Sequence, residues 1–348
     1  MGGQRRKNLI YSATAAAVLA VVIAAPGTAA QGDPGTISWQ APSPATGSVV
    51  SSGAGSKLTI KLTASSLVPT AVVRIARAGK LPRGAKLASV PGNPAHATMT
   101  WTPTGRQIGN RVLRFTAADN SPVKLSAPTL AVTTQVGPGI RALSGVDNVS
   151  RWAYVIRKAV VRSAPRVTAH AKGRLSNWTP ENYPNLALAL QQRIERSGTW
   201  VQVRLAMLPN NSTGWIKRGA LGSMRITHDH LVVNRSTTRA TLFRDGEAVF
   251  STRVGVGKSF WPTPRGEFYV TEKMSGFRDA AYGPVAFGTS ARSPVLTDWP
   301  GGGFIGIHGT DAPGLIPGHV SHGCVRLRNI AILRLARMMQ IGTPLSIH

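Results

Sequence analysis

The sequence predicts a mainly β protein made of three successive domains behind an N-terminal export segment. Short runs in which polar and apolar residues alternate recur along the 348 residues, and glycines and prolines separate these runs. Such alternation is typical of half-buried β-strands that end in turns. In the last third of the chain, helical spacing appears only after Cys324. We therefore expect a β scaffold with one short helix near its C-terminus.

The first 30 residues have the order of a secretory signal peptide. A basic start at Arg5 to Lys7 precedes an uncharged apolar run from Leu9 to Ala25, and the small residues Thr28 to Ala30 follow. The run is short for the about 20 residues of a comfortable bilayer span, so we expect cleavage after Ala30, with an uncleaved membrane anchor as the alternative. In both cases the rest of the chain lies outside the cytoplasm: secreted, in the periplasm or in the cell wall.

The chain is strongly basic, with 41 Lys and Arg against 13 Asp and Glu and a net charge of +28. Cleavage after Ala30 would remove three positive charges and leave +25. Such a field favours acidic partners. Export excludes nucleic acid and leaves an anionic envelope polymer or a membrane surface. A GC-rich genome that favours Arg and Ala explains part of the excess, and the dispersed charge argues against a dedicated polyanion tail.

Residues 34–136 predict an all-β domain. The segment Ser56 to Ala64 alternates with a period of two, and "HATMTWTPT" and "NRVLRFTAAD" repeat the alternation on either side of the turn "GRQIG". Several short strands at this spacing predict a small β-sandwich. The domain resembles the immunoglobulin-like repeats of bacterial surface proteins, and we interpret it as a spacer.

Residues 141–221 predict a second small β domain. After an "RSAP" segment, the runs "WVQVRL" and "GWI" form a pair of strands that resembles a bacterial SH3-like barrel. In such proteins this module docks on the catalytic domain or on the wall. We expect Trp200 and Trp215 to be core residues, since large aromatic side chains mostly serve burial.

Residues 224–347 predict a β-rich domain that ends in the helix. Asp245-Gly246 is a strong hairpin signal between two alternating runs, and Pro262 and Pro264 predict a bend before the strand "GEFYV". In "NIAILRLARMMQIG", Asn329 is expected to cap the helix and Gly342 to end it. The polar face of this helix comprises Arg334, Arg337 and Gln340.

The one cysteine of the chain, Cys324, lies in a polar segment, "HVSHGCVRLRN". A single cysteine in an exported chain forms no internal disulfide and indicates a reactive thiol. A neighbouring imidazole can take the thiol proton or stabilise the thiolate as imidazolium. If residues 322 to 324 are extended, His322, Cys324 and Arg326 share one face, where the arginine suits a substrate carboxylate. The backbone N–H groups of Gly323 and Cys324 would lie where an oxyanion forms.

Two other interpretations of this segment remain open. His308, His319, His322 and Cys324 are all zinc-type ligands, but the cluster lacks the compact paired spacing of zinc sites and contains no acidic residue or second cysteine. An inert structural cysteine with incidental histidines is the other alternative. We favour the thiol nucleophile, because four chemically active side chains in a short segment make a poor core.

The stretch "IGIHGTDAPGLIPGHVSHGCVRL" resembles the signature of the L,D-transpeptidase family, whose YkuD-type catalytic domain carries a His-Gly-Thr element followed by Ser-His-Gly-Cys. "TPRGEF", "AYGPVAFG" and "WPGGGFIGIHGT" are similar to further elements of that family, and the resemblance covers residues 224–347. It implies that Cys324 is the nucleophile and His308 the base. It further assigns oxyanion stabilisation and shaping of the site to Gly323, His322, Ser321 and Gly309, and substrate binding to Arg326, Thr310 and Tyr282.

The resemblance also implies the reaction. The cysteine attacks the carbonyl of the L-centre of a diamino acid in a peptidoglycan stem tetrapeptide, and the terminal D-residue leaves. A stem amine, a protein lysine or water then resolves the thioester and gives a cross-link, an anchored protein or carboxypeptidase activity. No cofactor is implied. A non-catalytic wall-binding protein and a secreted cysteine peptidase are the alternatives from other classes.

Two positions depart from the family pattern. Some members have serine after the first histidine, whereas here it is Gly309, so a backbone carbonyl must orient His308. Arg326 stands where other members have asparagine. The preference for a donor or an acceptor on the substrate therefore differs at this position.

Overall fold

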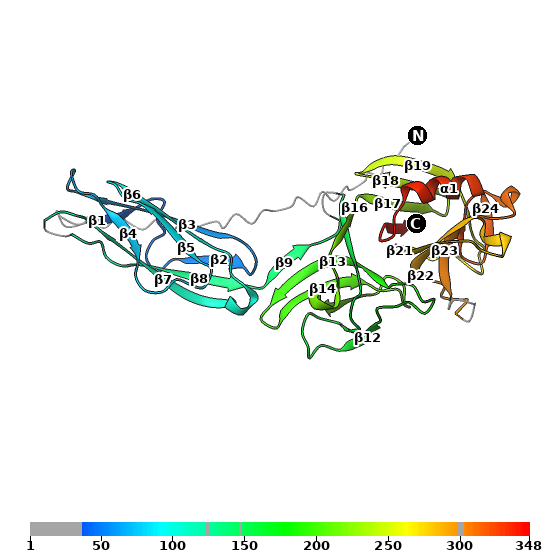
Figure 1. The fold of residues 1–348 in the computed structure, drawn as a ribbon, viewed down its shortest axis with the longest axis horizontal. Helices are drawn as coiled ribbons and strands as arrows, with labels where there is room; N and C mark the ends of the chain where they lie inside the picture. The colour runs from blue at the N-terminus through cyan, green and yellow to red at the C-terminus, as the bar shows by residue number, and fades with distance from the viewer. Residues whose placement is uncertain (1–36, 123–124, 146–147, 298–302) are drawn as a thin grey trace, which may run out of the picture. The chain divides into compact units, whose positions relative to one another are not determined.

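The computed structural model describes residues 37–122, 125–145, 148–297 and 303–348 (Figure 1). The export segment expected in residues 1–30 lies outside the described residues. Within them, no helix has the length and apolar character needed to cross a membrane. The chain divides into two compact units, the first containing residues 37–103 and 109–137 and the second residues 104–108 and 138–348. The expected mainly β fold is confirmed.

The first unit contains two four-stranded sheets. One has the order β1 (Ile37–Gln40), β3 (Leu58–Ser66), β6 (Ala95–Trp101), β5 (Lys86–Val90). The other has the order β2 (Val49–Gly53), β8 (Leu130–Gly137), β7 (Gly109–Ala118), β4 (Arg74–Arg77). Leu58, Ile60 and Leu62 on β3 are buried, whereas the residues between them are exposed. The period of two in the sequence thus marks the core face. The expected turn "GRQIG" is the 3₁₀ turn Gly105–Gln107 between β6 and β7.

The second unit begins with an eight-stranded sheet built from residues 139–227. Its strands follow the order β12 (Ala171–Leu175), β11 (Ala159–Arg162), β15 (Thr213–Lys217), β14 (Gly198–Arg204), β13 (Leu186–Glu195), β10 (Ser150–Tyr154), β16 (Arg225–Thr227), and β9 (Gly139–Ala142) also pairs with β13. A 3₁₀ turn, Arg218–Ala220, follows β15. Trp200 and Trp215 are buried, as expected of core residues. The names immunoglobulin-like and SH3-like, and the three domain boundaries, stay interpretations of the sequence.

The last part of the chain forms a ten-stranded sheet. Its order is β19 (Glu247–Arg253), β18 (Arg239–Arg244), β17 (Asp229–Asn234), β26 (Pro344–Ile347), β21 (Gly266–Ser275), β22 (Val285–Arg292), β23 (Phe304–His308), β25 (Val325–Arg326), β20 (Gly255–Gly257), β24 (Gly318–Ser321). Two 3₁₀ turns, Ala280–Tyr282 and Pro313–Leu315, lie in its connections. The hairpin expected at Asp245-Gly246 joins β18 to β19, and both residues have positive φ, 51° and 86°. That is the geometry of a tight two-residue turn.

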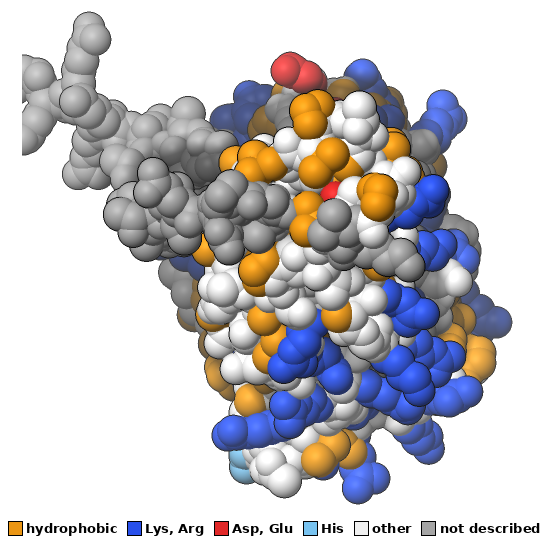
Figure 2. Space-filling view, turned by 90° about the vertical axis from the view of Figure 1, so that its left-hand side faces the viewer, with side chains coloured by type: hydrophobic (Ala, Val, Ile, Leu, Met, Phe, Trp, Pro, Cys, Tyr) orange, Lys and Arg blue, Asp and Glu red, His pale blue; other side chains and the backbone are white. Residues whose placement is uncertain are grey.

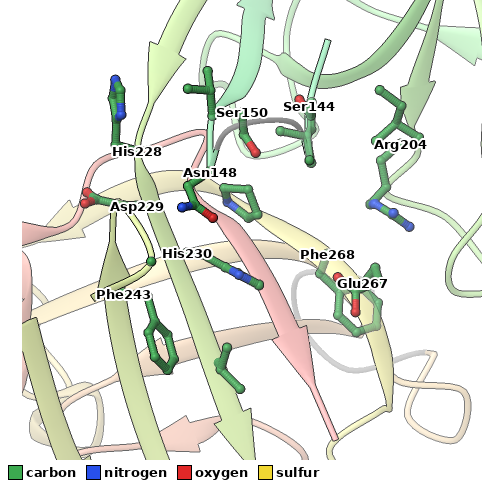
Figure 3. A pocket seen from close by; sticks show the side chains of 17 residues that line it. Ser144, Asn148, Ser150, Arg204, His228, Asp229, His230, Phe243, Glu267 and Phe268 are labelled. Carbon is green, nitrogen blue, oxygen red and sulfur yellow. The ribbon is translucent and has the colours of Figure 1, made fainter. Parts of the chain in front are cut away.

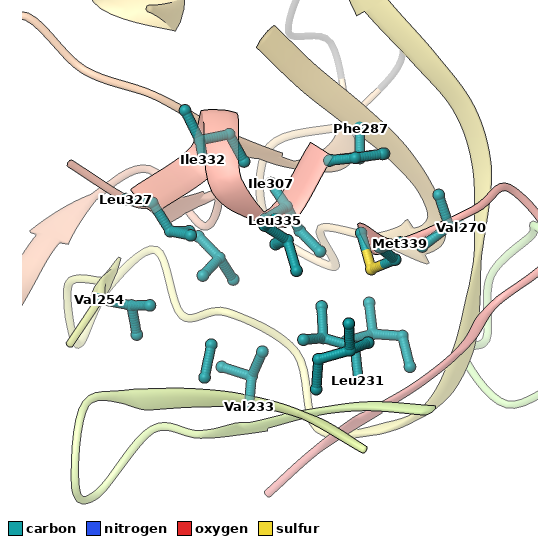
Figure 4. Close-up of a cluster of buried hydrophobic side chains, with 14 of the residues drawn as sticks. Leu231, Val233, Val254, Val270, Phe287, Ile307, Leu327, Ile332, Leu335 and Met339 are labelled. Carbon is teal, nitrogen blue, oxygen red and sulfur yellow. The ribbon is translucent and has the colours of Figure 1, made fainter. Parts of the chain in front are cut away.

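Helix α1 (Asn329–Met338) packs on this sheet and closes its core (Figure 4). Its buried residues Ile332 and Leu335 belong to the same apolar cluster as Leu231 and Phe287 of the sheet. Two sequence expectations about the helix ends are wrong. Asn329 makes no capping hydrogen bond, because the helix begins at Asn329 itself and Arg328 is the N-cap residue. The helix ends at Met338, four residues before Gly342.

Gly342 instead connects the two sheets of the second unit. Its φ is +78°, and a Cβ atom at this position would overlap the indole of Trp152 on β10. The phenol of Tyr269 on β21 donates to the carbonyl of Leu186 on β13 at 3.2 Å, which adds a polar link. Because these contacts are buried, residues 139–227 and 228–348 form one compact unit.

The Gly342–Trp152 contact predicts a stability difference between two glycine substitutions. Gly276 also has φ +78° but has no atom near the position of a Cβ, so it is a matched control. Gly276→Ala should lose about 1–2 kcal/mol for a side chain in left-handed backbone. Gly342→Ala should lose about 1–3 kcal/mol more through overpacking against the indole. Chemical denaturation of both variants measures the difference, and equal losses would contradict the role given to Trp152.

Candidate active site

The strand register brings the reactive residues to one face. β23 and β25 are parallel neighbours, with Ile307 opposite Val325 and His308 opposite Arg326. Side chains alternate along a strand, so Ile307 and Val325 point into the core, where both are buried. The residues on either side of them therefore share the opposite face. This places His308 next to Arg326, and Gly306 next to Cys324.

These residues line a cavity of about 230 Å³. Of the residues proposed from the sequence, Cys324, His308, His322, Arg326 and Tyr282 contribute to its wall. Cys324 is half-buried and forms part of the cavity wall. The other lining residues are Asp279, Ala281, Ser293, Leu296, Gly303, Phe304 and Ile305.

The thiol of Cys324 is held in a partly desolvated environment. Burial raises its pKa, and a hydrogen bond from the Gly306 N–H at 3.3 Å and the charge of Arg326 act in the opposite direction. A Cβ atom on residue 306 would lie 3.8 Å from both the sulfur and Cδ2 of His308. Glycine at this position therefore keeps the space beside both reactive groups open. With its pKa raised, the thiol is protonated at neutral pH.

The imidazole of His308 is buried and neutral. Burial and, to a lesser extent, the charge of Arg326 lower its pKa to about 4, although hydrogen bonds to the carbonyls of Gly309 and Ala281 act in the opposite direction. His308 Nδ1 lies 2.7 Å from the Gly309 carbonyl oxygen, which can only accept, so Nδ1 carries the proton and Nε2 keeps its lone pair. Because Gly309 has no side chain, we expect a backbone carbonyl to orient His308, and the Gly309 carbonyl takes this position.

Gly309 and Thr310 hold this segment in place rather than facing the cavity. A Cβ on Gly309 would meet Gly283 and Pro284, so this close approach requires glycine. The Thr310 N–H donates to Oδ1 of Asn329 at 2.9 Å, and its hydroxyl accepts from the Ala312 N–H at 3.1 Å. Thr310 is only 1% exposed and does not line the cavity. The assignment of Thr310 to substrate binding is therefore not supported, because its polar groups are used inside the loop.

Thr263, from the "TPRGEF" stretch, ties the nucleophile loop to the sheet. Its buried hydroxyl donates to the Gly323 carbonyl at 2.7 Å and accepts from the Gly257 N–H at 2.8 Å. The Ser321 hydroxyl likewise donates to the Cys324 carbonyl at 2.6 Å and accepts from the Gly323 N–H at 3.1 Å. These bonds fix a turn whose Gly323 has φ +120°. Residues 322 to 324 are therefore not extended, contrary to the condition set from the sequence.

The two histidines before Cys324 differ in position. The ring of His322 lies against Trp261, with centroids 4.1 Å apart, and lines the cavity. Burial, with the charges of Lys258 and Arg326, lowers the pKa of His322. His319 is exposed, and its Nδ1 lies 3.2 Å from the Gly257 carbonyl. Among the described residues, no three or more His, Cys, Asp or Glu side chains are grouped as a metal site would require.

Arg326 and Tyr282 provide the polar wall of the cavity. Nε of Arg326 is buried without a hydrogen-bond partner, and its charge acts on the titration of His308, His322 and Cys324. The ring of Tyr282 lies 5.1 Å from that of His308. Burial raises the pKa of Tyr282, so its phenol keeps its proton at neutral pH.

Sequence reasoning missed three contributors to the site. Asn329 was assigned to the helix cap, yet it holds the loop that follows His308. Trp261, beside the bend prolines, supports His322. Asp279 accepts from the Ala281 N–H at 2.9 Å and so fixes the turn that carries Tyr282. Only Asp279, three residues before Tyr282, gave a signal in the sequence, as an Asp that begins a turn.

A larger cavity of about 540 Å³ in the same unit lies elsewhere (Figure 3). None of the residues proposed from the sequence lines it. Glu267 and His230 in its wall are joined through Ser346, which donates to Glu267 at 2.7 Å and accepts from Nε2 of His230 at 2.8 Å. The candidate active site is therefore the smaller cavity around Cys324.

Comparison with known proteins identifies the class of this domain. Residues 228–347 match the family model described as YkuD, L,D-transpeptidase catalytic domain. Over 119 residues the chain is 30% identical to YkuD of Bacillus subtilis, whose name assigns it to the L,D-transpeptidases; the match covers 34% of this chain and 65% of that protein. The Bacillus licheniformis YkuD is 34% identical over 106 residues, or 30% of this chain and 57% of that protein. Residues 228–347 thus correspond to the L,D-transpeptidase catalytic domain of the YkuD family, and the chain spans less than two thirds of the length of these two relatives.

Solved structures give similar matches. An L,D-transpeptidase from Mycobacterium smegmatis is 15% identical, with 91% of this chain and 100% of that chain covered and a TM-score of 0.27. The catalytic domain of an Enterococcus faecium L,D-transpeptidase is 22% identical, with 34% and 96% covered and a TM-score of 0.27.

The two hydrogen bonds of Thr263 predict the effect of removing its hydroxyl. Thr263→Val should leave the buried Gly257 N–H and Gly323 carbonyl without partners and cost about 1–3 kcal/mol of unfolding free energy for each group. Thr263→Ser keeps the hydroxyl and should recover most of this loss. Chemical denaturation measures stability, and the rate of Cys324 alkylation reports on the loop. Equal stability of the valine and serine variants would contradict the role of the hydroxyl.

Proposed function

We propose that this protein is a peptidoglycan L,D-transpeptidase that uses Cys324 as nucleophile. The observation that carries the proposal is the shared cavity of thiol, imidazole and guanidinium, together with the membership of residues 228–347 in the YkuD family. The thiol attacks the L-centre carbonyl of a stem tetrapeptide, and the peptide bond to the terminal D-residue breaks. An amine then takes the acyl group from sulfur and forms the cross-link.

Proton transfer in this proposal starts from two neutral groups. The pKa of Cys324 is raised and that of His308 is lowered to about 4, so a resting thiolate–imidazolium pair is disfavoured. Nε2 of His308 therefore takes the thiol proton as the C–S bond forms, and gives it to the leaving amine. The carbonyls of Gly309 and Ala281 favour the protonated ring, so they stabilise the imidazolium formed on the way.

Groups other than the Gly323 N–H stabilise the oxyanion in this mechanism. That N–H donates to the Ser321 hydroxyl, so it is engaged within the loop. The oxyanion instead accepts hydrogen bonds from the Cys324 N–H next to the sulfur and from the protonated phenol of Tyr282. The phenol is suited to this role because its raised pKa keeps the proton available.

Arg326 is the proposed anchor for a substrate carboxylate. A guanidinium with a buried, unpartnered Nε costs free energy in the empty site. A carboxylate can offset that cost through charge-assisted hydrogen bonds. Stem peptides carry carboxylates, so Arg326 fits the substrate class of the family.

The proposed location is the extracytoplasmic cell envelope, with residues 1–30 as export signal or anchor. The charge of the chain supports an anionic wall polymer as a second partner. The described residues of the first unit contain nine Lys or Arg and a single acid, Asp119. Figure 2 shows a face on which Lys and Arg far outnumber Asp and Glu.

Intact mass spectrometry with a stem tetrapeptide and an amine acceptor tests the proposal. The wild-type protein should gain the mass of the donor acyl group while the tetrapeptide releases its terminal D-residue, whereas Cys324→Ala should form no adduct but stay folded. A carbapenem offers a second acylating probe. Water as sole acceptor would indicate a carboxypeptidase, hydrolysis despite abundant amine would indicate a peptidase, and no adduct in the wild type would favour a wall-binding protein.

The pKa directions predict an unusual pH profile. His308 must be neutral to accept the thiol proton, so the acylation rate should fall only as pH drops through about 4 rather than through the ordinary 6.5. Toward alkaline pH, the thiolate should form only above the ordinary cysteine value of 9.0, because burial raises the pKa. Stopped-flow acylation across pH measures both limbs. An acid limb near 6.5 would contradict a neutral, desolvated His308.

A further inference from the structure

A second cavity of about 520 Å³ lies next to the candidate active site within the second unit. We call it the Trp178 groove. The hairpin of residues 176–185, Glu272 on β21, Arg292 and Phe304 contribute to its lining. Phe304 lines both this groove and the cavity around Cys324, so the two cavities adjoin at this side chain. A ligand in the groove therefore lies beside a substrate of the active site.

Trp178 is presented on a rigid support. The side chain is 49% exposed, unlike the buried Trp200 and Trp215. The hairpin is held by backbone bonds from Thr179 N–H to the Tyr183 carbonyl at 2.8 Å and from Asn185 N–H to the Asn177 carbonyl at 2.9 Å. The Asn185 side chain adds a bond to the Ser176 carbonyl at 2.8 Å. Such a fixed, half-exposed indole offers a flat apolar face at little cost in conformational entropy.

Two carboxylates face the same groove. Glu272 is half-buried, and its side chain lies directly on the backbone of Gly288, where even a Cβ would displace it. Glu181 stands on the hairpin opposite and is exposed. Burial raises the pKa of Glu272, and the charge of Glu181 raises it further. A half-buried carboxylate beside a second group of like charge works against stability and is common in binding sites.

Two basic side chains, Arg174 on β12 and Arg292, line the groove as well, and Arg292 is fixed. The guanidinium of Arg292 lies 3.4 Å from the centroid of the Phe304 ring, and its Nε donates to the Ala206 carbonyl at 3.2 Å. Acceptors and donors thus surround one aromatic face, an arrangement that suits a neutral, hydroxyl-rich ligand better than an ion of either sign.

We propose that the Trp178 groove binds the saccharide part of the polymer whose peptide enters the active site. A pyranose ring presents C–H groups to the indole face and hydroxyl and acetamido groups to Glu181, Glu272 and Arg174. The inference rests on the proposed function for the identity of the polymer. Because Phe304 lines both cavities, one glycopeptide places its peptide in the active site and its saccharide in the Trp178 groove.

Steady-state acylation with two donors tests the inference. One donor is the free stem tetrapeptide, and the other is the same tetrapeptide carrying its N-acetylated disaccharide. In the wild type the disaccharide should raise kcat/KM about tenfold, mainly through KM. Trp178→Ala should abolish this advantage and leave the free tetrapeptide unaffected. Tyr183→Ala is the matched control, because Tyr183 is exposed on the same hairpin but does not line the groove.

Calorimetric titration with a β-1,4-linked N-acetylglucosamine tetrasaccharide separates this inference from the proposed function, since it needs no catalysis. Wild type and Tyr183→Ala should bind, and Trp178→Ala and Glu272→Ala should bind at least tenfold more weakly. Equal kcat/KM for the two donors, or equal sugar affinity of Trp178→Ala and wild type, would overturn the inference while leaving the transpeptidase intact. Sugar binding without any acyl-enzyme would uphold the groove and overturn the proposed function.

Discussion

The parallel pairing of β23 with β25 is the constraint on which the candidate site depends. It joins two segments that are 18 residues apart at Gly306 and Cys324, and its register sends their reactive side chains to one face and Ile307 and Val325 to the other. A slip of one residue would exchange the two sets and bury the thiol in the apolar core. The burial of Ile307 and Val325 therefore fixes the position of the thiol and the imidazole as well as stabilising the fold.

Hydrogen bonds from buried hydroxyl groups then give the nucleophile loop its shape. Thr263 and Ser321 each donate to one carbonyl and accept from one N–H around the Gly323-Cys324 pair. Desolvation strengthens these hydrogen bonds. It also raises the pKa of the Cys324 thiol and lowers that of the His308 imidazole, so both groups are neutral. Arg326 thus carries a permanent charge beside the reacting pair, which becomes charged only during proton transfer.

The Trp178 groove lies beside the candidate active site and offers room for a larger part of a substrate. Phe304 lines both the cavity around Cys324 and the groove with an exposed indole. The groove takes its walls from both parts of the second unit, the hairpin 176–185 and strand β21. The segment interpreted as SH3-like therefore contributes surface next to the active site.

The sequence by itself determined the mainly β fold, the Asp245-Gly246 hairpin, the single helix and the identity of the reactive segment, because alternation, turn chemistry and motif spacing are local properties. Tertiary structure alone decided that His308 lies beside Arg326, that Thr310 and Asn329 serve the loop, that Gly323 breaks the extended path, and that Trp178 faces a groove. Each of these depends on contacts between residues far apart in the chain, or on a backbone dihedral angle that packing imposes. A one-dimensional pattern carries no information on which strands become neighbours, and that neighbourhood sets burial, hydrogen bonding and pKa.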